Sequence, residues 1–181
     1  AERILKDSGL VALWESIGAK VNVIGSLAAR LMMTHRDIDL HIYTDEVDLE
    51  QTFSVMAKFT ANPCVGMVWF RNLINTEEEC VEWHAAYTTP EGEDWSIDMI
   101  HIRKGSFFDG YAERVAARLR EVLTPEQRMA ILRLKADTPE GAKAMGIEYY
   151  VAVVRDGVKT YAEFERWKKD TPIEGVTTWV P

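Results

Sequence analysis

The sequence predicts an α+β protein, in which helices pack on one face of a mixed β-sheet and a helical segment follows at the C-terminal end. Three observations lead to this prediction. Apolar and polar residues alternate over 36–44, as in a strand with one buried face. Three stretches between 64 and 103 are rich in aromatic and β-branched residues, which favour strands. From 107 to 169 the apolar positions recur at helical spacing.

Helices and strands are expected to alternate in the first part of the chain. The apolar positions of 3–18 follow helical spacing and predict one amphipathic helix. The segment KVNVIGS, residues 20–26, predicts a short buried strand that runs into a Gly-Ser turn, and LAARLMM, residues 27–33, favours a helix. After the strand over 36–44, the apolar residues of 46–60 return to near-helical spacing. We expect this helix to cross back over the sheet.

Three further strands are expected at 64–74, 80–89 and 94–103. The PEGED turn between the last two strands favours a β-hairpin. Because these strands are predicted to be antiparallel, the complete sheet is expected to be mixed.

Beyond the last strand the chain is expected to be helical. Thr124-Pro125 and Thr138-Pro139 each fit a helix N-cap followed by Pro at the first helical position, and we expect three or four helices in all. An irregular tail is expected from Pro172. The sequence therefore predicts a core domain over 1–105 and a C-terminal helical segment over 106–181 that packs on it.

The composition is that of a globular protein, with 47% hydrophobic and 28% charged residues in a chain of 181. Because the net charge is −8, we do not expect a nucleic-acid partner, although a local basic pocket is left open. Cys64 and Cys80 lack zinc-binding spacing and are expected to be reduced thiols. The sequence shows no apolar run of membrane-spanning length, and its start lacks signal-peptide features, so we expect a cytoplasmic protein with no membrane partner. A homodimer is left open.

The stretch THRDIDLHIY, residues 34–43, has two interpretations. Its His-Arg-Asp tripeptide matches the catalytic loop of protein kinases. That loop requires Asn five positions after the Asp, where this chain has Ile42. A Gly-rich loop and a strand Lys are also missing upstream in the sequence, and 181 residues are too few for a two-lobed kinase. The kinase interpretation therefore fails.

The other interpretation joins Ile24-Gly25-Ser26 to Asp37-Ile38-Asp39-Leu40, which begins after ten intervening residues. An apolar residue, Gly and then Gly or Ser at a strand end, followed by a short helix and a strand with Asp-apolar-Asp, is the motif of the DNA polymerase β-like nucleotidyltransferase superfamily. The sequence resembles this superfamily over roughly residues 20–103. The superfamily has a third carboxylate on a later strand, and Asp98 in WSIDMIHI matches it.

Within the superfamily, the sequence most resembles the small antibiotic nucleotidyltransferases of the lincosamide and aminoglycoside type. Their His-x-Asp-Ile-Asp motif is matched by residues 35–39, and their Ile-Asp-apolar segment by residues 97–99. The resemblance implies a nucleotidyltransferase-type fold. It also implies transfer of a nucleoside monophosphate, most simply AMP from ATP, to a hydroxyl group of a small molecule such as an antibiotic.

The resemblance also implies roles for individual residues. Asp37 and Asp39 project from the same face of one strand, and with Asp98 they would hold two Mg²⁺ ions about 3.5–4 Å apart. Mg²⁺ prefers oxygen ligands and shares them with phosphates, so a nucleoside triphosphate is the expected co-substrate. Asp98 is expected to bind the second ion or to act as general base for the acceptor hydroxyl. Gly25 and Ser26 would hold phosphates through backbone N–H groups and the serine hydroxyl.

The phosphate-binding part of the motif departs from the superfamily. Many members have Arg directly after the Gly-Ser, or a basic residue shortly before the first Asp, and these positions hold Leu27 and Met33 here. Arg30 and Arg36 are candidate substitutes, and His35 is a further candidate contact of the co-substrate. The departure supports an alternative function, a catalytically silent nucleotidyltransferase-like domain that binds nucleotide or a protein. Transfer to a protein or to an RNA end is a third interpretation.

The sequence leaves the orientation of Asp98 open. By strand periodicity Asp98 shares its face with Ile100 and Ile102, so we expect that a bulge or a strand end turns it toward the other carboxylates. His84 and His101 carry no motif and are expected to be ordinary sheet residues.

The aromatic residues of the expected sheet are interpreted as core and cross-strand pairs. A flat acceptor or a nucleobase could stack on one of them, and the sequence does not identify which. These residues are Trp69, Phe70, Trp83, Tyr87 and Trp95.

Overall fold

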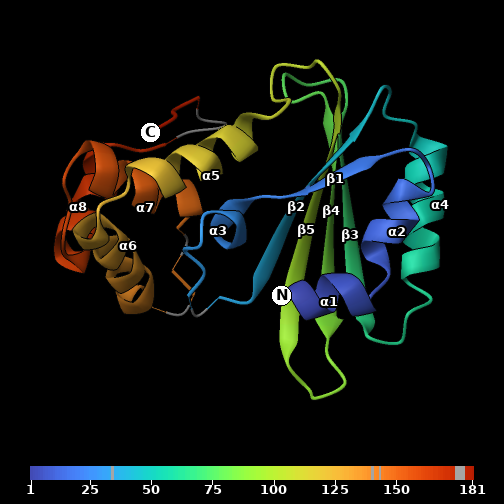
Figure 1. Ribbon diagram of the computed structural model, residues 1–181, viewed down its shortest axis with the longest axis horizontal. Helices are drawn as coiled ribbons and strands as arrows, with labels where there is room; N and C mark the ends of the chain where they lie inside the picture. Colours follow the sequence, from blue (N-terminus) through green and yellow to red (C-terminus); the bar gives the residue numbers. More distant parts are fainter. Residues whose placement is uncertain (34, 140, 143, 174–177) are drawn as a thin grey trace. The chain divides into compact units, whose positions relative to one another are not determined.

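The computed structural model divides the chain into two compact units (Figure 1). It describes residues 1–33, 35–139, 141–142, 144–173 and 178–181. Unit 1 contains Ala1–Ile24 and Arg36–Gly110, and unit 2 contains Gly25–His35 and Tyr111–Pro181. The segment 25–35, which the sequence assigned to the core, thus groups with the C-terminal helices. Domains with the bounds 1–105 and 106–181 stay a prediction.

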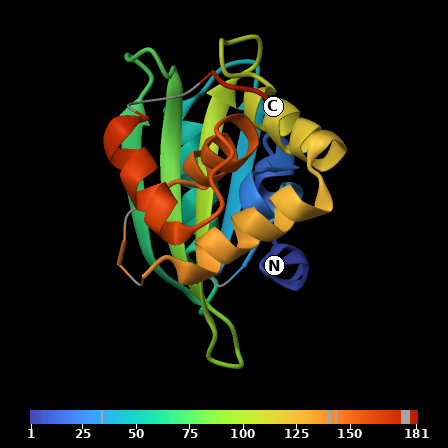
Figure 2. The same ribbon diagram turned by 90° about the vertical axis from the view of Figure 1, so that its left-hand side faces the viewer.

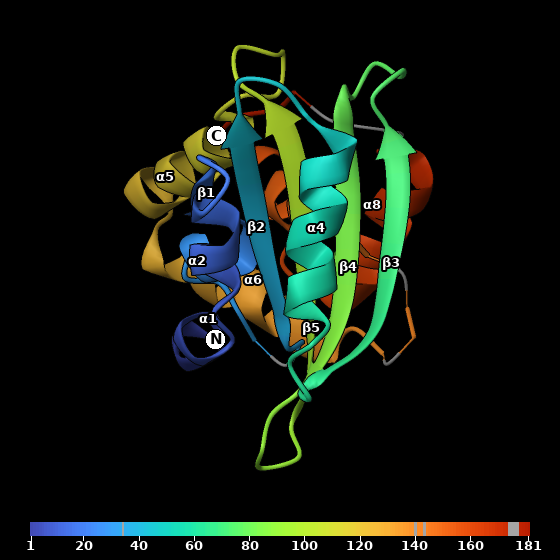
Figure 3. The same cartoon turned by 90° about the vertical axis from the view of Figure 1, so that its right-hand side faces the viewer.

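Unit 1 is built on one five-stranded sheet with the strand order β1-β2-β5-β4-β3 (Figure 3). The strands are β1 (Lys20–Val23), β2 (Asp37–Thr44), β3 (Val65–Leu73), β4 (Cys80–Thr88) and β5 (Asp94–Arg103). The central pair, β2 and β5, is parallel, and the other neighbours are antiparallel. The sheet is mixed, as the sequence predicts, and β1 and β3 form its edges.

The helices of unit 1 are α1 (Glu2–Asp7), α2 (Leu10–Glu15) and α4 (Leu49–Phe59). The prediction of one helix over 3–18 is wrong, because Gly9 adopts a left-handed conformation with φ 69° and separates α1 from α2. The Ser8 hydroxyl accepts a hydrogen bond from the N–H of Leu10 at 3.3 Å and stabilises this break. Helix α4 begins after Asp48, whose carboxylate accepts a hydrogen bond from the backbone N–H of Gln51.

These helices pack on one face of the sheet, with α2 and α4 lying across it (Figure 3). Alternate residues of the strands point toward them and form the main core of unit 1, for example Ile38 and Leu40 on β2 and Ile97 and Met99 on β5. The prediction that helices pack on one face of a mixed sheet is confirmed. The other set of alternate residues forms what we call the second face of the sheet.

The second face changes character along the strands. Tyr43, Leu73, Cys80 and Ile102 form a small buried apolar cluster at one end of it. Cys64 and Cys80 are both free thiols, and burial raises the pKa of Cys80 to about 12, so this thiol stays protonated at neutral pH. Asp37, Asp39 and Asp98 lie toward the opposite end of the strands.

Unit 2 is helical. Its elements are α3 (Gly25–Ala28), α5 (Tyr111–Val122), α6 (Pro125–Asp137), α7 (Gly146–Tyr150), the π-helix η1 (Val151–Arg155) and α8 (Tyr161–Asp170). Figure 2 shows the last helix in red, α6 in orange and α5 in yellow. Their apolar faces share one core, in which the Phe164 ring stacks between Tyr149 at 4.7 Å and Trp167 at 5.9 Å.

Two sequence-based details of unit 2 are corrected. The helix predicted over 27–33 is only the short α3, and the chain leaves the helix where Arg30 takes a left-handed φ of 58°. Thr124 caps α6 as predicted, but Thr138 ends that helix instead of starting another. The Thr138 hydroxyl donates to the carbonyl of Leu134 at 2.7 Å. Residues 174–177 of the tail expected from Pro172 lie outside the described residues.

Within the described ranges, no helix is both long and apolar enough for a membrane span.

Candidate active site

The three carboxylates proposed from the sequence lie on the second face of unit 1. Asp37 is the first residue of β2, and Asp39 lies two residues further on, so both side chains project from the same side. In the parallel pair of β2 and β5, Asp37 is the register partner of Ser96 and Asp39 is the register partner of Asp98. Asp39 and Asp98 therefore stand side by side on adjacent strands, about 4.8 Å apart at the backbone.

The orientation of Asp98 needs no bulge. The pairing of β5 with β4 runs without a shift from Asp94 to Ile102, so Asp98 keeps the same face as Ile100 and Ile102. Those two isoleucines fall at the apolar end of the second face, where Ile102 belongs to the small buried cluster and Ile100 packs against it. One strand face is thus polar at one end and apolar at the other.

Asp98 is held by two side chains. The Ser96 hydroxyl donates to Asp98 Oδ1 at 3.0 Å, and His84 Nδ1 lies 2.8 Å from the same oxygen. Because an ionised carboxylate only accepts hydrogen bonds, Nδ1 is the protonated ring nitrogen in this contact. His84 carries no sequence motif and was expected to be an ordinary sheet residue, so its contact with Asp98 is a correction to that prediction.

A signal for the His84 contact was present in the predicted hairpin. Residues equally far from the centre of an antiparallel hairpin become partners, so that Thr88 pairs with Asp94 and His84 pairs with Asp98. Applying this register to the expected strands would have placed the histidine opposite the carboxylate.

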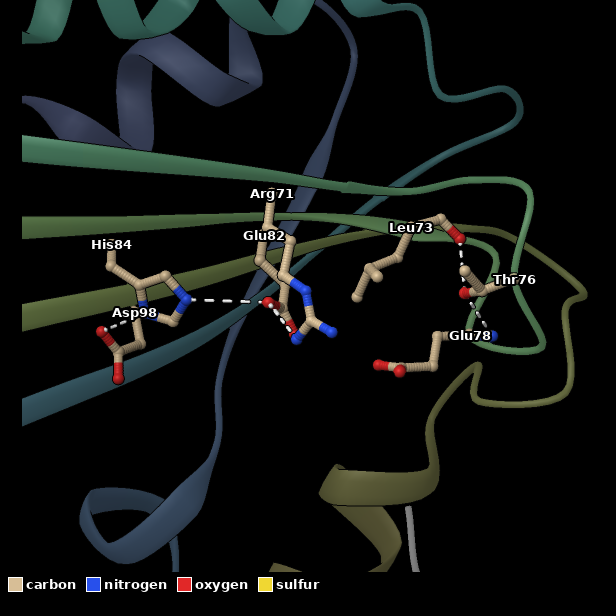
Figure 4. Close-up of polar contacts among 7 residues, drawn as sticks. All are labelled: Arg71, Leu73, Thr76, Glu78, Glu82, His84 and Asp98. Carbon is tan, nitrogen blue, oxygen red and sulfur yellow. Dashed lines mark hydrogen bonds and ion pairs between the residues drawn. The ribbon is translucent and has the colours of Figure 1, made fainter. Parts of the chain in front are cut away.

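Two more charged side chains extend the arrangement along β4 and β3 (Figure 4). The other ring nitrogen of His84, Nε2, lies 3.9 Å from Glu82 Oε2, and Arg71 Nη1 lies 3.5 Å from the same oxygen. Figure 4 shows the imidazole between the carboxylates of Asp98 and Glu82. The side chains therefore follow one another from β3 to β5 in the order Arg71, Glu82, His84 and Asp98.

The carboxylates fit a metal ion that binds together with a nucleotide. Among the residues that the structure describes, no group of three His, Cys, Asp or Glu side chains is arranged to hold a metal by itself. Mg²⁺, however, is usually bound by one or two carboxylates together with substrate phosphates and water. The adjacent pair of Asp39 and Asp98, with Asp37 beside it, offers the hard oxygen ligands of such a site. The assignment of all three as ligands stays a prediction.

The predicted phosphate-binding turn belongs to unit 2. Gly25 begins α3 with φ 62°, a left-handed conformation that Gly adopts at little cost, and Ser26 is buried. The carbonyl of Ser26 accepts the N–H of Leu31 at 2.8 Å. These contacts explain why this stretch folds as a compact turn. Phosphate binding by Gly25 and Ser26 remains an implication of the sequence resemblance.

Basic side chains from distant parts of unit 2 gather at the segment that follows this turn. Arg120 donates to the carbonyl of Ala28 at 2.6 Å, and Arg128 donates to the carbonyl of Arg30 at 2.7 Å. The buried ammonium of Lys135 donates to the carbonyl of Leu31 at 3.1 Å. The sequence pattern lacked a basic residue at Leu27 or Met33, and the fold brings three cations to the stretch between those positions.

The remaining sequence candidates have simpler surroundings. Arg36 forms an exposed ion pair with Glu93 at 3.0 Å within unit 1. His35 is exposed in unit 2. Binding of the co-substrate by Arg36 and His35 stays a prediction.

By sequence, the chain matches no family model and no curated protein. By structure, it is similar to the complex of the poly(A) polymerase GLD-2 with GLD-3, with a TM-score of 0.61 and 11% identity over 94% of this chain and 57% of that chain. It is also similar to the Cid1 poly(U) polymerase bound to MgGTP, with a TM-score of 0.59 and 16% identity over 84% of this chain and 48% of that one. A cytoplasmic RNA terminal U-transferase gives a TM-score of 0.56 and 14% identity, over 84% of this chain and 46% of that one.

These similarities confirm the predicted fold, which is of the nucleotidyltransferase type with a mixed five-stranded sheet. This chain spans about half the length of the three solved structures. The closer resemblance to antibiotic nucleotidyltransferases gains no support from them and rests on the sequence motifs alone. Because the three proteins are named as polymerases or transferases of RNA, a net charge of −8 does not suffice to exclude an RNA acceptor for this fold.

Proposed function

We propose that this protein is a Mg²⁺-dependent nucleotidyltransferase that moves a nucleoside monophosphate, AMP from ATP, onto a hydroxyl group of a small molecule. The observation that carries the proposal is the in-register pair of Asp39 and Asp98 on adjacent parallel strands, with Asp37 on the same face. Three carboxylates in this arrangement, on a nucleotidyltransferase-type fold, have the donor chemistry that metal-assisted phosphoryl transfer requires.

In the proposed reaction, the acceptor hydroxyl oxygen attacks the α-phosphorus of the triphosphate. The bond from the α-phosphorus to the oxygen that bridges to the β-phosphate breaks, and pyrophosphate leaves. Asp37 and Asp39 would hold Mg²⁺, which neutralises charge on the phosphates when it is bound. The acceptor proton passes to Asp98. Both protein contacts of Asp98 use Oδ1, so we assign the proton to Oδ2.

An RNA 3′ end is the second candidate acceptor. It is favoured by the similarity to solved structures of a poly(A) polymerase and an RNA terminal U-transferase. The chemistry at the carboxylates is the same for either acceptor, because both present a hydroxyl to the α-phosphorus. The acceptor must therefore be distinguished by binding.

A catalytically silent domain is the alternative from another class. Its support is the absence of a basic residue at Leu27 and Met33 in the sequence. The three cations that reach residues 28–31 in unit 2 weaken this support, since they bring positive charge to the same segment.

The test combines nucleotide binding with product formation. The protein is mixed with Mg²⁺ and each nucleoside triphosphate, and pyrophosphate release is followed with a panel of hydroxylated small molecules and with single-stranded RNA. We expect Mg²⁺-dependent nucleotide binding that is strongly weakened in the double variant Asp37→Asn/Asp39→Asn. Absence of nucleotide binding, or equal binding by the double variant, contradicts the enzymatic function. Nucleotide binding without pyrophosphate release for any acceptor supports the silent domain.

A further inference from the structure

The row of residues that contains the candidate catalytic carboxylates continues to the edge of the sheet. Asp39 on β2 pairs with Asp98 on β5, Asp98 pairs with His84 on β4, and His84 pairs with Trp69 on β3. Side chains of register partners share a face, and the ring centroids of Trp69 and His84 lie 6.5 Å apart. Four strands thus present two carboxylates, an imidazole and an indole in one line, which we call the Asp98 row.

Trp69 differs from the other aromatic residues of the sheet. Trp83 and Tyr87 belong to the core on the helix-covered face, and Phe70 and Trp95 pack against that core. Trp69 points to the second face and is 61% exposed. Met67, two residues earlier on the same edge strand, is equally exposed. The exposed part of the indole is open to a ligand, and an aromatic ring with a polar N–H beside a candidate site can stack on a flat group.

The position of Trp69 suits a specific part of the acceptor. Two strand spacings separate it from Asp98, which amounts to roughly 10 Å. The attacking hydroxyl must come within hydrogen-bonding distance of Asp98. A ring that stacks on the indole therefore has to be joined to that hydroxyl across most of this span. A terminal nucleoside has this construction, with a base at one end and the 3′-hydroxyl of its ribose at the other.

The residue next to Trp69 on this face is a cation. Arg71 is the register partner of Glu82, lies two residues beyond Trp69, and has a side chain that is 65% exposed. An aromatic platform with a neighbouring cation is the combination with which proteins bind single-stranded nucleic acid, because the base stacks while the cation meets a phosphate.

We propose that Trp69 and Arg71 form the acceptor subsite of this protein, and that its occupant is the 3′-terminal nucleotide of a single-stranded RNA. The terminal base stacks on the Trp69 indole, the phosphate on its 5′ side meets Arg71, and the 3′-hydroxyl is directed along the Asp98 row. This inference rests on the proposed function and selects its second acceptor. A planar small molecule is the competing occupant.

The protein's charge gives the subsite a measurable signature. With a net charge of −8, affinity for RNA has to come mainly from stacking and from few phosphate contacts. Each phosphate contact on a single strand contributes about 0.7 to the slope of log K against log salt. We expect a shallow slope, of about 1, which Arg71→Gln lowers by about 0.7.

The experiment measures binding of fluorescein-labelled single-stranded oligoribonucleotides by anisotropy, with Mg²⁺ and without nucleotide. Loss of a base stack corresponds to an increase in Kd of about 5-fold to 150-fold, which we expect for Trp69→Ala. Trp69→Phe keeps a ring and is expected to recover most of the affinity. Phe107→Ala is the matched control, because Phe107 is a more exposed aromatic residue of unit 1 that lies beyond the end of β5.

A second comparison locates the base. An oligoribonucleotide whose 3′-terminal residue is abasic is expected to bind the native protein as weakly as the intact strand binds the Trp69→Ala variant. The Trp69→Ala substitution is expected to cause no further loss of affinity for this abasic strand. Removing an internal base is expected to leave the effect of Trp69→Ala in place. Equal Kd values for the native protein and Trp69→Ala, or an abasic 3′ end without effect, overturn the proposal. Trp69-dependent binding of a planar small molecule with no RNA binding also overturns it.

The Asp98→Asn variant separates this proposal from the proposed function. It is expected to bind RNA with an unchanged Kd and to release pyrophosphate about 10²-fold to 10⁴-fold more slowly. If the native protein transfers no nucleotide to any acceptor but binds RNA through Trp69, the subsite stands and the enzymatic function fails. If it transfers nucleotide to a small molecule and Trp69→Ala changes neither KM nor kcat, the enzymatic function stands and the subsite fails.

Discussion

His84 and His101 stand on neighbouring strands of one sheet and have opposite surroundings. His84 lies on the second face, donates to Asp98 and approaches Glu82. His101 points to the helix-covered face, where it meets the edge of the Trp14 ring at 5.2 Å and lies 2.7 Å from the Thr44 hydroxyl. Burial lowers the pKa of His101 to about 4, so this ring is neutral in the folded protein at neutral pH.

This difference indicates that the two faces of the β4–β5 pair have different roles, one in the proposed reaction and the other in stability. The helix-covered face is closed and apolar, and its polar groups are neutral or paired. The second face keeps ionisable side chains in contact with one another around Asp98. Substitutions on the second face are therefore expected to change activity more than stability, and substitutions on the other face are expected to do the reverse.

The largest effect is expected at Asp98. Asp98→Asn keeps the size of the side chain and an oxygen that accepts from Ser96 and His84, but it removes the proton acceptor. We expect kcat to fall by about 10²-fold to 10⁴-fold, the usual contribution of a general base. Stability is expected to change by less than about 1 kcal/mol, because Asp98 is half-buried outside the core and the variant keeps its size and its hydrogen-bond acceptor. Pyrophosphate release and urea unfolding measure the two effects, and a large loss of stability with normal kcat contradicts the assignment.

The next residue tests the opposite face. Met99 is fully buried in the core beneath the helices. Met99→Ala removes buried methylene groups and leaves a cavity, so the free energy of unfolding should fall by about 2–5 kcal/mol. At a temperature where the variant stays folded, its kcat is expected to stay within a few-fold of the native value. Met99→Leu is the matched control, since it nearly conserves volume and should cost less than about 1.5 kcal/mol.

The buried histidine predicts acid sensitivity. The folded pKa of His101 is about 4 and the ordinary value is 6.5, so between these values the unfolded chain binds a proton that the folded protein excludes. Stability is therefore complete above pH 6.5 and decreases as the pH falls toward 4, by about 3 kcal/mol from this group. Urea unfolding at a series of pH values measures this slope. His101→Gln removes the titration, and an unchanged pH dependence in that variant contradicts the prediction.

The sequence was sufficient for the strands and for the acidic face of β2. Alternation over 36–44 indicates which residues face the core, and it predicts that Asp37 and Asp39 both lie on the opposite face. The breaks at Gly9 and Arg30 were missed, because the apolar spacing continues through them and a left-handed residue leaves no trace in periodicity. The single helix over 3–18 therefore became two.

The surroundings of Asp98 required the register between strands. Its place beside Asp39 depends on the pairing of β2 with β5, which joins residues about sixty positions apart and is fixed by packing under the helices. The exposure of Trp69 likewise depends on β3 being an edge strand, and a neighbouring aromatic residue, Phe70, is half-buried against the core of the other face. Periodicity identifies the two faces of a strand but not what each face meets.

The smallest effect is expected at His84, and it tests whether this histidine positions Asp98. In His84→Ala, Asp98 loses one of the two hydrogen bonds that orient its carboxylate, and we expect kcat to fall about tenfold, equivalent to about 1.4 kcal/mol. KM for the nucleotide is expected to stay nearly constant, because His84 is assigned no contact with it. Steady-state kinetics of pyrophosphate release separate the two constants.

Rescue by a hydrogen-bond donor distinguishes positioning from simple packing. His84→Asn offers an amide N–H to the carboxylate, whereas His84→Leu fills similar space without a donor. A positioning role predicts that Asn recovers most of the lost kcat and that Leu behaves like Ala, with similar unfolding curves for all three variants. If Asn and Leu are equally impaired, the 2.8 Å contact of His84 with Asp98 has no part in the reaction, and His84, like His101, is structural.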